Sequence, residues 1–373
     1  MKYDVAVVGL GGMGSAVLAR AAMRGVRAVG IEQFALRHEL GASVGKTRII
    51  RKAYFEDSAY VPLLLRAYEL WRDVERRTGS DLMRITGLLL AGTPASEAVA
   101  GSQAAAKTYG LAVDVLTARD LRKRFPRLNL RDDEIGVYER EGGVVFPEAA
   151  IDAHLKLAEM RGATIVEQTA MSSWDADDAT VRLRLADGSV VEAGAAVFTL
   201  GPWFARELKA LGVALTVQRN VQVWFEPESR DWDVGAFPAF LVERPEQPVL
   251  YGFPDMGDGI KAAFHAHGVE TQPDALRRKV TDDDVRPLAR AVNAWMPGAA
   301  GKFRFAKACM YSLTPDRHFV IDRHPQHRNV VLCGGFSGHG FKFASVVGEI
   351  GAQLALDGAT THDLDFLSLR RFG

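Results

Sequence analysis

The chain has 373 residues, of which 48% are hydrophobic and 25% are charged, and its 46 basic residues balance its 46 acidic residues to a formal net charge of zero. This apolar content can offset the entropy of ordering, which excludes a disordered chain. The lack of a positive field disfavours a nucleic-acid-binding protein. The length predicts about two domains.

The two cysteines, Cys309 and Cys333, are too few for a disulfide scaffold, so a reducing compartment is expected. The N-terminus begins directly in a strand-like run, and no signal peptide is expected there. No apolar run approaches the ~18 residues that a membrane-spanning helix needs. We predict a cytoplasmic protein without membrane contacts, and we predict no metal site.

A β-turn-α-β unit is predicted at the start of the chain. Residues 4–8 form an apolar run typical of a strand that is buried on both faces, and a glycine-rich segment follows at once. Residues 15–24 have apolar side chains at helical spacing. Residues 26–31 are expected to form the second strand of the unit.

Helix and strand patterns follow along the rest of the chain. Helices are predicted over residues 62–77 and 151–161. Strands are predicted at residues 88–90, 136–138, 143–146, 163–169, 181–185, 190–192, 195–199, 221–225 and 260–265. The C-terminal segment returns to the opening pattern, with a strand over residues 330–333, a glycine-rich stretch and a helix over residues 344–356.

The two ends of the chain carry nucleotide-binding patterns, and the middle has a different pattern of predicted elements. Together they predict an α/β (mixed α+β) fold. Its first domain is expected to be Rossmann-like and discontinuous, and its second domain to be an insertion built on an antiparallel sheet. The first domain is assigned to residues 1–85, 145–213 and 306–373. The second domain is assigned to residues 86–144 and 214–305.

Gly9, Gly11 and Gly14 match the dinucleotide-binding spacing G-x-G-x-x-G. The first glycine permits a tight turn, the second lets the backbone approach a diphosphate, and the third lets helix and strand pack closely. The start of the helix then offers N–H groups and a positive dipole end to the phosphates. Glu32 ends the second strand, where a carboxylate accepts hydrogen bonds from a ribose, so NADP is disfavoured while FAD and NAD both remain open.

The segment from Gly41 to Thr47 resembles a phosphate-binding G-x-x-x-x-G-K-T loop. The spacing fails by one residue, because Leu40 occupies the position of the first glycine. No buried strand precedes the segment either. Nucleotide hydrolysis is therefore not predicted.

Four further segments decide between FAD and NAD. They are Lys-Thr-Arg-Ile-Ile-Arg at residues 46–51, Tyr-Gly-Phe-Pro at 251–254, Lys-Ala-Cys-Met-Tyr at 307–311 and Gly-Phe-Ser-Gly-His-Gly-Phe-Lys-Phe at 335–343. With the glycine motif, they make residues 3–367 similar to the monomeric sarcosine oxidase family, which includes N-methyltryptophan oxidase and belongs to the D-amino-acid-oxidase-like flavoproteins. The resemblance implies a monomer with FAD, and an inserted domain that binds substrate.

The resemblance also implies the reaction. Members of the family oxidise the C–N bond of a secondary amino acid such as sarcosine: a hydride passes to flavin N5, the resulting imine hydrolyses, and O2 is reduced to H2O2. By the same resemblance Cys309 bonds covalently to the flavin. Arg51 and Lys342 hold the substrate carboxylate, which two converging cations bind through charge-assisted hydrogen bonds. Lys261 lies near flavin N5, where a cation favours oxygen reduction, and Arg48 adds positive potential.

Other residues line the site in the resemblance. Tyr251, His265 and Tyr311 are expected around the substrate, with Leu241 in the place of a pocket methionine. The peptide N–H groups around the second glycine-rich stretch are expected to stabilise negative charge on the reduced flavin. The cofactor contacts implied in all are Gly9, Gly11, Gly12, Met13, Gly14, Glu32, Thr47, Arg48, Cys309, Gly338, His339, Gly340, Phe341 and Lys342.

The sequence departs from the family at a few positions. Ser43, Val44, Gly45 and Lys46 stand where relatives usually carry two histidines and Gly-Asp. Together with Leu241, these changes bear on flavin attachment and on substrate size. The alternatives left open are an oxidase of a cyclic imino acid such as proline or pipecolate, and a flavin amine dehydrogenase with another electron acceptor; an NAD-dependent dehydrogenase and a non-catalytic flavoprotein are disfavoured.

Overall fold

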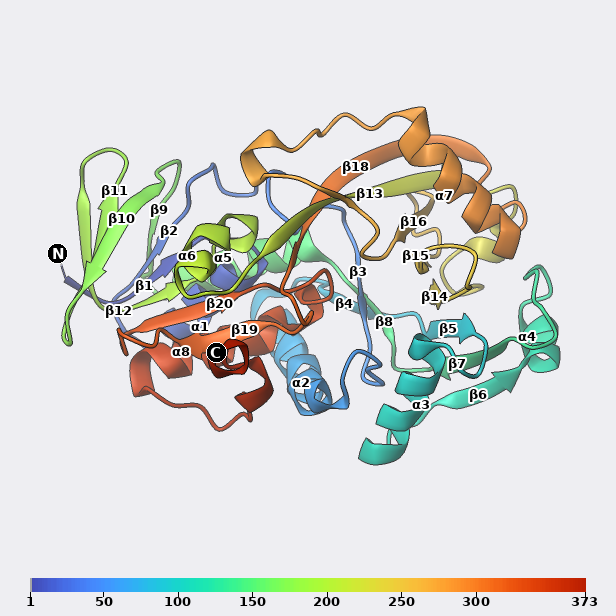
Figure 1. Ribbon diagram of the computed structural model, residues 1–373, viewed down its shortest axis with the longest axis horizontal. Coiled ribbons are helices and arrows are strands. Elements are labelled where there is room, and N and C mark those ends of the chain that lie inside the picture. The colour runs from blue at the N-terminus through green and yellow to red at the C-terminus, as the bar shows by residue number, and fades with distance from the viewer. Residues whose placement is uncertain (1) are drawn as a thin grey trace.

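The computed structural model describes residues 2–373, and Figure 1 shows two large sheets set side by side along its long axis. The first sheet has a parallel centre, as its apolar strands predicted. In spatial order the parallel strands are β20 (Val330–Gly334), β12 (Val190–Phe198), β1 (Lys2–Val8), β2 (Ala28–Ile31) and β9 (Thr164–Val166). Antiparallel strands β10 (Met171–Ala176), β11 (Val181–Leu185) and β19 (Val320–Arg323) complete this sheet.

Both faces of the first sheet are covered. Val5 and Val7 of β1 pack in one core with four helices, whereas Ala6 and Val8 point the other way into a second core with the β10–β11 hairpin and α6 (Ala205–Ala210). The four helices are α1 (Gly12–Met23), α2 (Val61–Thr78), α5 (Pro147–Met160) and α8 (Ala344–Asp357). The carboxyl end of β1, and the glycine turn that follows it, therefore lie at the edge of a sheet that is packed on both faces.

The second sheet is formed by later segments of the chain. Its strands are β5 (Leu88–Gly92), β6 (Asp114–Thr117), β7 (Ile135–Glu139), β13 (Thr216–Glu226), β14 (Ala239–Val242), β15 (Leu250–Phe253), β16 (Ile260–Phe264), β17 (Val269–Glu270) and β18 (Lys302–Leu313). Helices α4 (Ala118–Arg124) and α7 (Asp282–Trp295) contribute to one hydrophobic core of this sheet, and α3 (Glu97–Tyr109) contributes to a second core. A small sheet of β3 (Arg48–Ile50), β8 (Gly143–Val145) and β4 (Met83–Ile85) lies between the two large sheets.

The predicted fold class is confirmed, with local differences. Helix α1 begins at Gly12, not at residue 15, because the glycine turn itself supplies the first helical residues. The strands predicted at residues 190–192 and 195–199 are one strand, β12, which pairs with β11 as far as Ala193 and with β20 from Ala196. The second sheet is not wholly antiparallel, since β14 runs parallel to β5. The two strand differences arise from pairing partners that lie far away in the sequence.

The division into two domains stays a prediction. Its boundary between residues 305 and 306 falls inside β18, which pairs with β13 from Lys302 to Leu313. All of β18 is therefore hydrogen-bonded within the second sheet. Among the helices of residues 2–373, none is long and apolar enough to cross a membrane.

We predict that the contact between α1 and α8 is sensitive to a single methyl group. A Cβ at Gly348 would lie 2.7 Å from the backbone carbon of Ala16, whereas a Cβ at Gly351 would meet a side-chain methyl of Val17 at 2.8 Å. Gly348→Ala should lower the free energy of unfolding by about 1–2 kcal/mol, because overpacking against backbone outweighs the helix propensity of alanine. Gly351→Ala is the matched control and should be close to neutral in urea unfolding; equal losses would contradict the prediction.

Candidate active site

The turn between β1 and α1 is shaped by its glycines. Gly9 has φ +86°, and a Cβ there would lie 2.6 Å from the carbonyl oxygen of Thr199. A Cβ at Gly14 would lie 1.8 Å from the carbonyl oxygen of Gly9, so helix and strand meet only without a side chain. A Cβ at Gly11, in contrast, has nothing within 4 Å. The turn therefore leaves open space beside Gly11 at the start of α1, which is the arrangement that a diphosphate needs.

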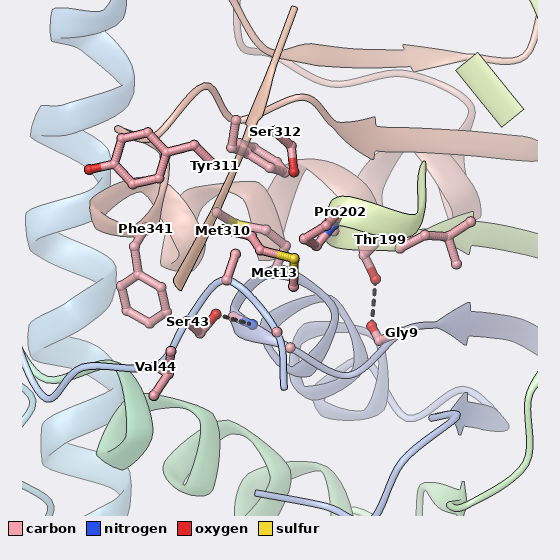
Figure 2. Close-up of a pocket in the computed structure, with 18 of the residues that line it drawn as sticks. Gly9, Met13, Ser43, Val44, Thr199, Pro202, Met310, Tyr311, Ser312 and Phe341 are labelled. Atoms are coloured by element: carbon pink, nitrogen blue, oxygen red, sulfur yellow. Dashed lines mark hydrogen bonds between the residues drawn. The ribbon is translucent and has the colours of Figure 1, made fainter. Parts of the chain in front are cut away.

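A cavity of about 600 Å³ begins at this turn and ends among residues of the second sheet. Figure 2 shows Gly9, Met13 and Thr199 along one part of its wall and Tyr311 and Phe341 along another. The wall is tied together by hydrogen bonds: the Thr199 hydroxyl donates to the Gly9 carbonyl at 2.6 Å, and the Gly12 N–H donates to Ser43 Oγ at 3.3 Å. A cavity of this volume, lined from the glycine turn to the second sheet, suits an extended ligand.

Glu32 lies in the cavity wall at the end of β2, as the sequence predicted for its position. Its carboxylate accepts the N–H of Leu10 at 2.8 Å and the N–H of Phe34 at 3.1 Å. The acid therefore braces the glycine turn from the neighbouring strand while it faces the cavity. Its remaining acceptor capacity is available to a ligand hydroxyl.

The phosphate-loop resemblance of residues 41–47 has no counterpart in the structure. The N–H groups of Gly45 and Lys46 donate to the carboxylate of Glu148 at 2.8 and 3.0 Å, and the Lys46 ammonium pairs with Asp258 at 2.8 Å. A carboxylate already occupies the position that a phosphate would need. The N–H groups that a phosphate-binding loop would offer are thus already bound within the protein.

Two cations are bound to the carbonyl groups of the same loop. Arg48 donates to the carbonyls of Ala42, Val44 and Thr47 at 3.0, 2.7 and 2.8 Å. The ammonium of Lys261, in β16, donates to the carbonyls of Gly45 and Thr47 at 2.6 and 2.7 Å. Burial, followed by the charge of Arg48, lowers the pKa of Lys261 well below its usual value. Arg48 lines the cavity, whereas Lys261 and Thr47 lie behind its wall.

Arg51 and Lys342 reach the same end of the cavity from two elements. Arg51 directly follows β3 and is 3% exposed; its guanidinium donates to the Ala53 carbonyl at 2.9 Å and pairs with Glu56. Lys342 lies in the short helix Phe341–Phe343, and its ammonium donates to the carbonyl of His339 at 2.6 Å. Burial, followed by the charge of Arg51, lowers the pKa of Lys342 to about 7. Burial alone would raise the pKa of Glu56, but Arg51 and Lys342 outweigh it and hold that pKa at about 2.

A hydrogen-bond chain orients Lys342. The Nε2 of His339 lies 3.0 Å from the carbonyl oxygen of Arg317, which can only accept, so Nε2 carries the proton. The Nδ1 of His339 then accepts from the hydroxyl of Tyr54 at 2.6 Å, and that oxygen lies 3.5 Å from the Lys342 ammonium. Burial lowers the pKa of His339 to about 3, which keeps its ring neutral. The imidazole of His339 therefore contributes to the site as well as its backbone.

The second sheet supplies an aromatic wall. Leu241, Tyr251, His265 and Tyr311 all line the cavity. The hydroxyls of Tyr251 and Tyr311 are 3.3 Å apart, and the ring of His265 lies 5.7 Å from that of Tyr311. Burial lowers the pKa of His265 to about 4 and raises that of Tyr251, so these groups are neutral near pH 7. The wall is thus uncharged and faces the buried cations.

Cys309 is fully buried in β18 and does not line the cavity. Its sulfur accepts the side-chain amide of Gln222 at 3.0 Å and packs against Val44, which does line the cavity. Met310 and Tyr311, the next two residues, also lie in the cavity wall. The sulfur is therefore separated from the cavity by about one layer of side chains.

The structure brings most of the predicted site residues to one cavity. Those in its wall are Gly9, Gly11, Gly12, Met13, Glu32, Arg48, Arg51, Leu241, Tyr251, His265, Tyr311, Gly338, His339, Gly340, Phe341 and Lys342. Those outside its wall are Gly14, Thr47, Lys261 and Cys309. Sequence reasoning missed Tyr54, Glu56 and Thr199. Thr199 follows the carboxyl end of a parallel strand, where ligands bind in open α/β sheets, and this rule would have found it.

Comparisons with known proteins agree with this geometry. A family model described as FAD dependent oxidoreductase matches residues 4–354. A monomeric sarcosine oxidase from Streptomyces avermitilis is 43% identical, covering 99% of this chain and 97% of its own. One from Bacillus sp. (strain B-0618) is 39% identical over 99% of this chain and 96% of its own. An N-methyl-L-tryptophan oxidase from Yersinia pestis (strain Pestoides F) is 33% identical over the full length of both chains.

Solved structures with lower identity share the fold. NikD, described as an unusual amino acid oxidase essential for nikkomycin biosynthesis, superposes with a TM-score of 0.87 at 24% identity, covering 98% of this chain and 97% of its own. An L-proline dehydrogenase from P. horikoshii has a TM-score of 0.85 at 22% identity, covering 100% of this chain and 98% of its own. At these identities the likeness concerns the arrangement of elements alone.

The pKa of about 7 for Lys342 predicts pH-dependent anion binding. A carboxylate binds better to the protonated ammonium, so its affinity should be constant below pH 7 and fall by up to about tenfold per pH unit above it. Methoxyacetate is a suitable probe because it carries the carboxylate but no titrating amine. Its dissociation constant can be followed through the absorption of bound flavin, with Lys342→Met as the control that should bind more weakly and without this pH dependence. A pH-independent wild type would contradict the prediction.

Proposed function

The chain belongs to the family of FAD-dependent oxidoreductases, and we propose that this protein oxidises a secondary amino acid that carries an N-methyl group, such as sarcosine. The observation that carries the proposal is the convergence of Arg51 and Lys342 at the end of a cavity that begins at a dinucleotide-binding turn. Two cations at that place select a substrate with a carboxylate. The relatives' names, monomeric sarcosine oxidase and N-methyl-L-tryptophan oxidase, support the same substrate class.

The residues of the glycine turn fit FAD. The open space beside Gly11 and the start of α1 suit the diphosphate, and Glu32 suits a ribose hydroxyl. The peptide groups around Gly338 and Gly340 lie in the wall at the other end. Bound FAD would supply the redox chemistry, accepting a hydride from the substrate and passing the electrons on to oxygen.

The chain itself binds and orients the substrate. Arg51 and Lys342 hold its carboxylate, which fixes the distance from that group to the reacting C–H bond. Tyr251, His265 and Tyr311 enclose the amine in neutral surroundings, because burial lowers the pKa of His265 to about 4. A buried, uncharged wall favours the unprotonated amine, which needs no general base to lose a hydride. The imine product hydrolyses in water to an aldehyde and a primary amino acid.

Positive charge near the reduced cofactor is proposed to assist oxygen reduction to hydrogen peroxide. Arg48 and Lys261 both donate to the carbonyl of Thr47, at 2.8 and 2.7 Å, so their charges lie close together. Lys261 acts from behind the cavity wall in this proposal, through its field rather than through contact. We also propose that the protein works as a monomer in the cytoplasm, in line with its two free cysteines and the names of its relatives.

The proposal predicts that sarcosine bleaches the flavin spectrum of the purified protein under anaerobic conditions. Readmitted air should restore the spectrum and release hydrogen peroxide in equal amount. A panel with N-methyl-L-tryptophan, proline and pipecolate separates the substrate classes. Faster bleaching by a cyclic amine than by sarcosine would identify the cyclic amine as the better substrate. A spectrum that bleaches but is not restored by air would indicate a dehydrogenase, and no bleaching by any amine would exclude oxidase function.

We further propose a thioether between the sulfur of Cys309 and the 8α-methyl carbon of FAD. Its formation would replace the thiol S–H bond and one C–H bond of that methyl group, and the two electrons released would reduce the flavin, which O2 would reoxidise. The sulfur lies directly behind Val44 in the cavity wall, whereas burial raises the pKa of the other thiol, Cys333, to about 12 and keeps it unreactive. Acid precipitation of the wild-type protein should therefore give a yellow pellet. Cys309→Ser should release its flavin into the supernatant, and Cys333→Ser, the matched control, should retain it. Complete release from the wild type would show that the flavin is held without a covalent bond.

A further inference from the structure

The loop that follows Arg51 is held by a buried carboxylate of the second sheet. Glu139, the last residue of β7, is 2% exposed. One of its oxygens accepts the N–H of Lys52 at 2.6 Å, and the other accepts the N–H of Ala53 at 2.9 Å. Two successive N–H groups just after β3 thus point at one anion. Figure 1 shows β3 between the two large sheets. Both oxygens of Glu139 are used as acceptors.

The next peptide group along the chain, which carries the Ala53 carbonyl, binds Arg51 itself. The Ala53 carbonyl accepts from the Arg51 guanidinium at 2.9 Å and from the hydroxyl of Ser102, in α3, at 3.3 Å. The guanidinium lies between the rings of Tyr54 and Phe55, 4.2 Å from the centre of each. The position of the arginine is therefore set by the backbone of residues 52–55, and that backbone is set by Glu139 and α3.

Glu139 does not serve as an ion-pair partner. The Lys52 ammonium turns away from it to Glu141 at 2.7 Å, and Arg51 pairs with Glu56. A buried carboxylate is costly unless its oxygens are satisfied, and here two backbone N–H groups satisfy them. Burial raises the pKa of Glu139, while these N–H groups and the charge of Arg51 oppose that rise. The two N–H groups thus offset the free-energy cost of burying this carboxylate, and the contact they form holds the backbone next to Arg51.

We propose that Glu139 is a positioning residue for substrate binding: from the second sheet it fixes the peptide groups of residues 52 and 53, and thereby the place at which Arg51 meets the substrate carboxylate. The inference rests on the proposed function, in which Arg51 binds that carboxylate. Weakening this contact lowers carboxylate affinity, whereas Lys342 still holds the bound carboxylate in place for the chemical step. About a tenfold loss of affinity is expected, which corresponds to about 1.4 kcal/mol.

The test compares Glu139→Gln with Glu141→Gln in the flavin-loaded protein. Glutamine keeps the shape of the side chain but presents an NH2 group to one of the two N–H donors. For Glu139→Gln, the KM of sarcosine and the dissociation constant of methoxyacetate should rise about tenfold, with kcat within about twofold of wild type. Glu141→Gln, which removes a partner of the Lys52 side chain only, should leave all three values unchanged.

Hydrogen exchange gives a second measurement that does not depend on turnover. The amides of Lys52 and Ala53 should exchange faster in Glu139→Gln than in the wild type or in Glu141→Gln.

If Glu139→Gln does not fold, a second variant is available. Ser102→Ala removes the hydrogen bond from the Ser102 hydroxyl to the Ala53 carbonyl and should raise the dissociation constant of methoxyacetate severalfold. Unchanged methoxyacetate binding in a folded Glu139→Gln protein, or an equal loss of kcat and flavin content, would overturn the inference. Wild-type protein that binds neither sarcosine nor methoxyacetate would instead overturn the proposed function, and exchange at residues 52 and 53 would still report on the contact.

Discussion

Buried positive charge is the constraint around which this cavity is built. Four cations approach it, and within residues 2–373 a carboxylate partner is found for Arg51 alone, which pairs with Glu56. The other three, Arg48, Lys261 and Lys342, are bound by main-chain carbonyl groups. Carbonyl dipoles satisfy the N–H donors of a buried cation without cancelling its charge. The site therefore keeps a net attraction for an anion, such as a substrate carboxylate.

The fold supplies these carbonyls through irregular backbone. The loop before β3 turns three carbonyls toward Arg48 and two toward Lys261, sharing that of Thr47 between them. Glu148 holds the N–H groups of the same loop from the other side. A loop whose donors face an acid and whose acceptors face cations is fixed in orientation without regular secondary structure. This explains how a segment outside the sheets positions functional groups reliably.

The division of labour between the two sheets follows from the same arrangement. The first sheet provides the glycine turn, Glu32 and Thr199, all at the carboxyl ends of parallel strands. The second sheet provides neutral aromatic groups on strands whose other faces pack in a core, so their positions are rigid. Arg51 lies where the sheets meet. Glu139 and Ser102, which pack with the second sheet, bind the loop after it, and His339, which follows β20 of the first sheet, binds Tyr54. In the proposed function, substrate orientation therefore depends on the contact between the sheets as well as on either sheet.

The sequence alone determined the features that depend on neighbouring residues. The β-turn-α-β unit, the roles of Gly9, Gly11 and Gly14, and helix α8 follow from local spacing, and the family resemblance identified Arg51 and Lys342 as a pair. Only the tertiary structure decided what each charge contacts. Lys261 meets the carbonyl of Thr47 across 214 residues of sequence, and Glu139 meets Ala53 across 86. Such contacts depend on how two sheets pack against each other, and no periodicity or spacing along the chain encodes that distance.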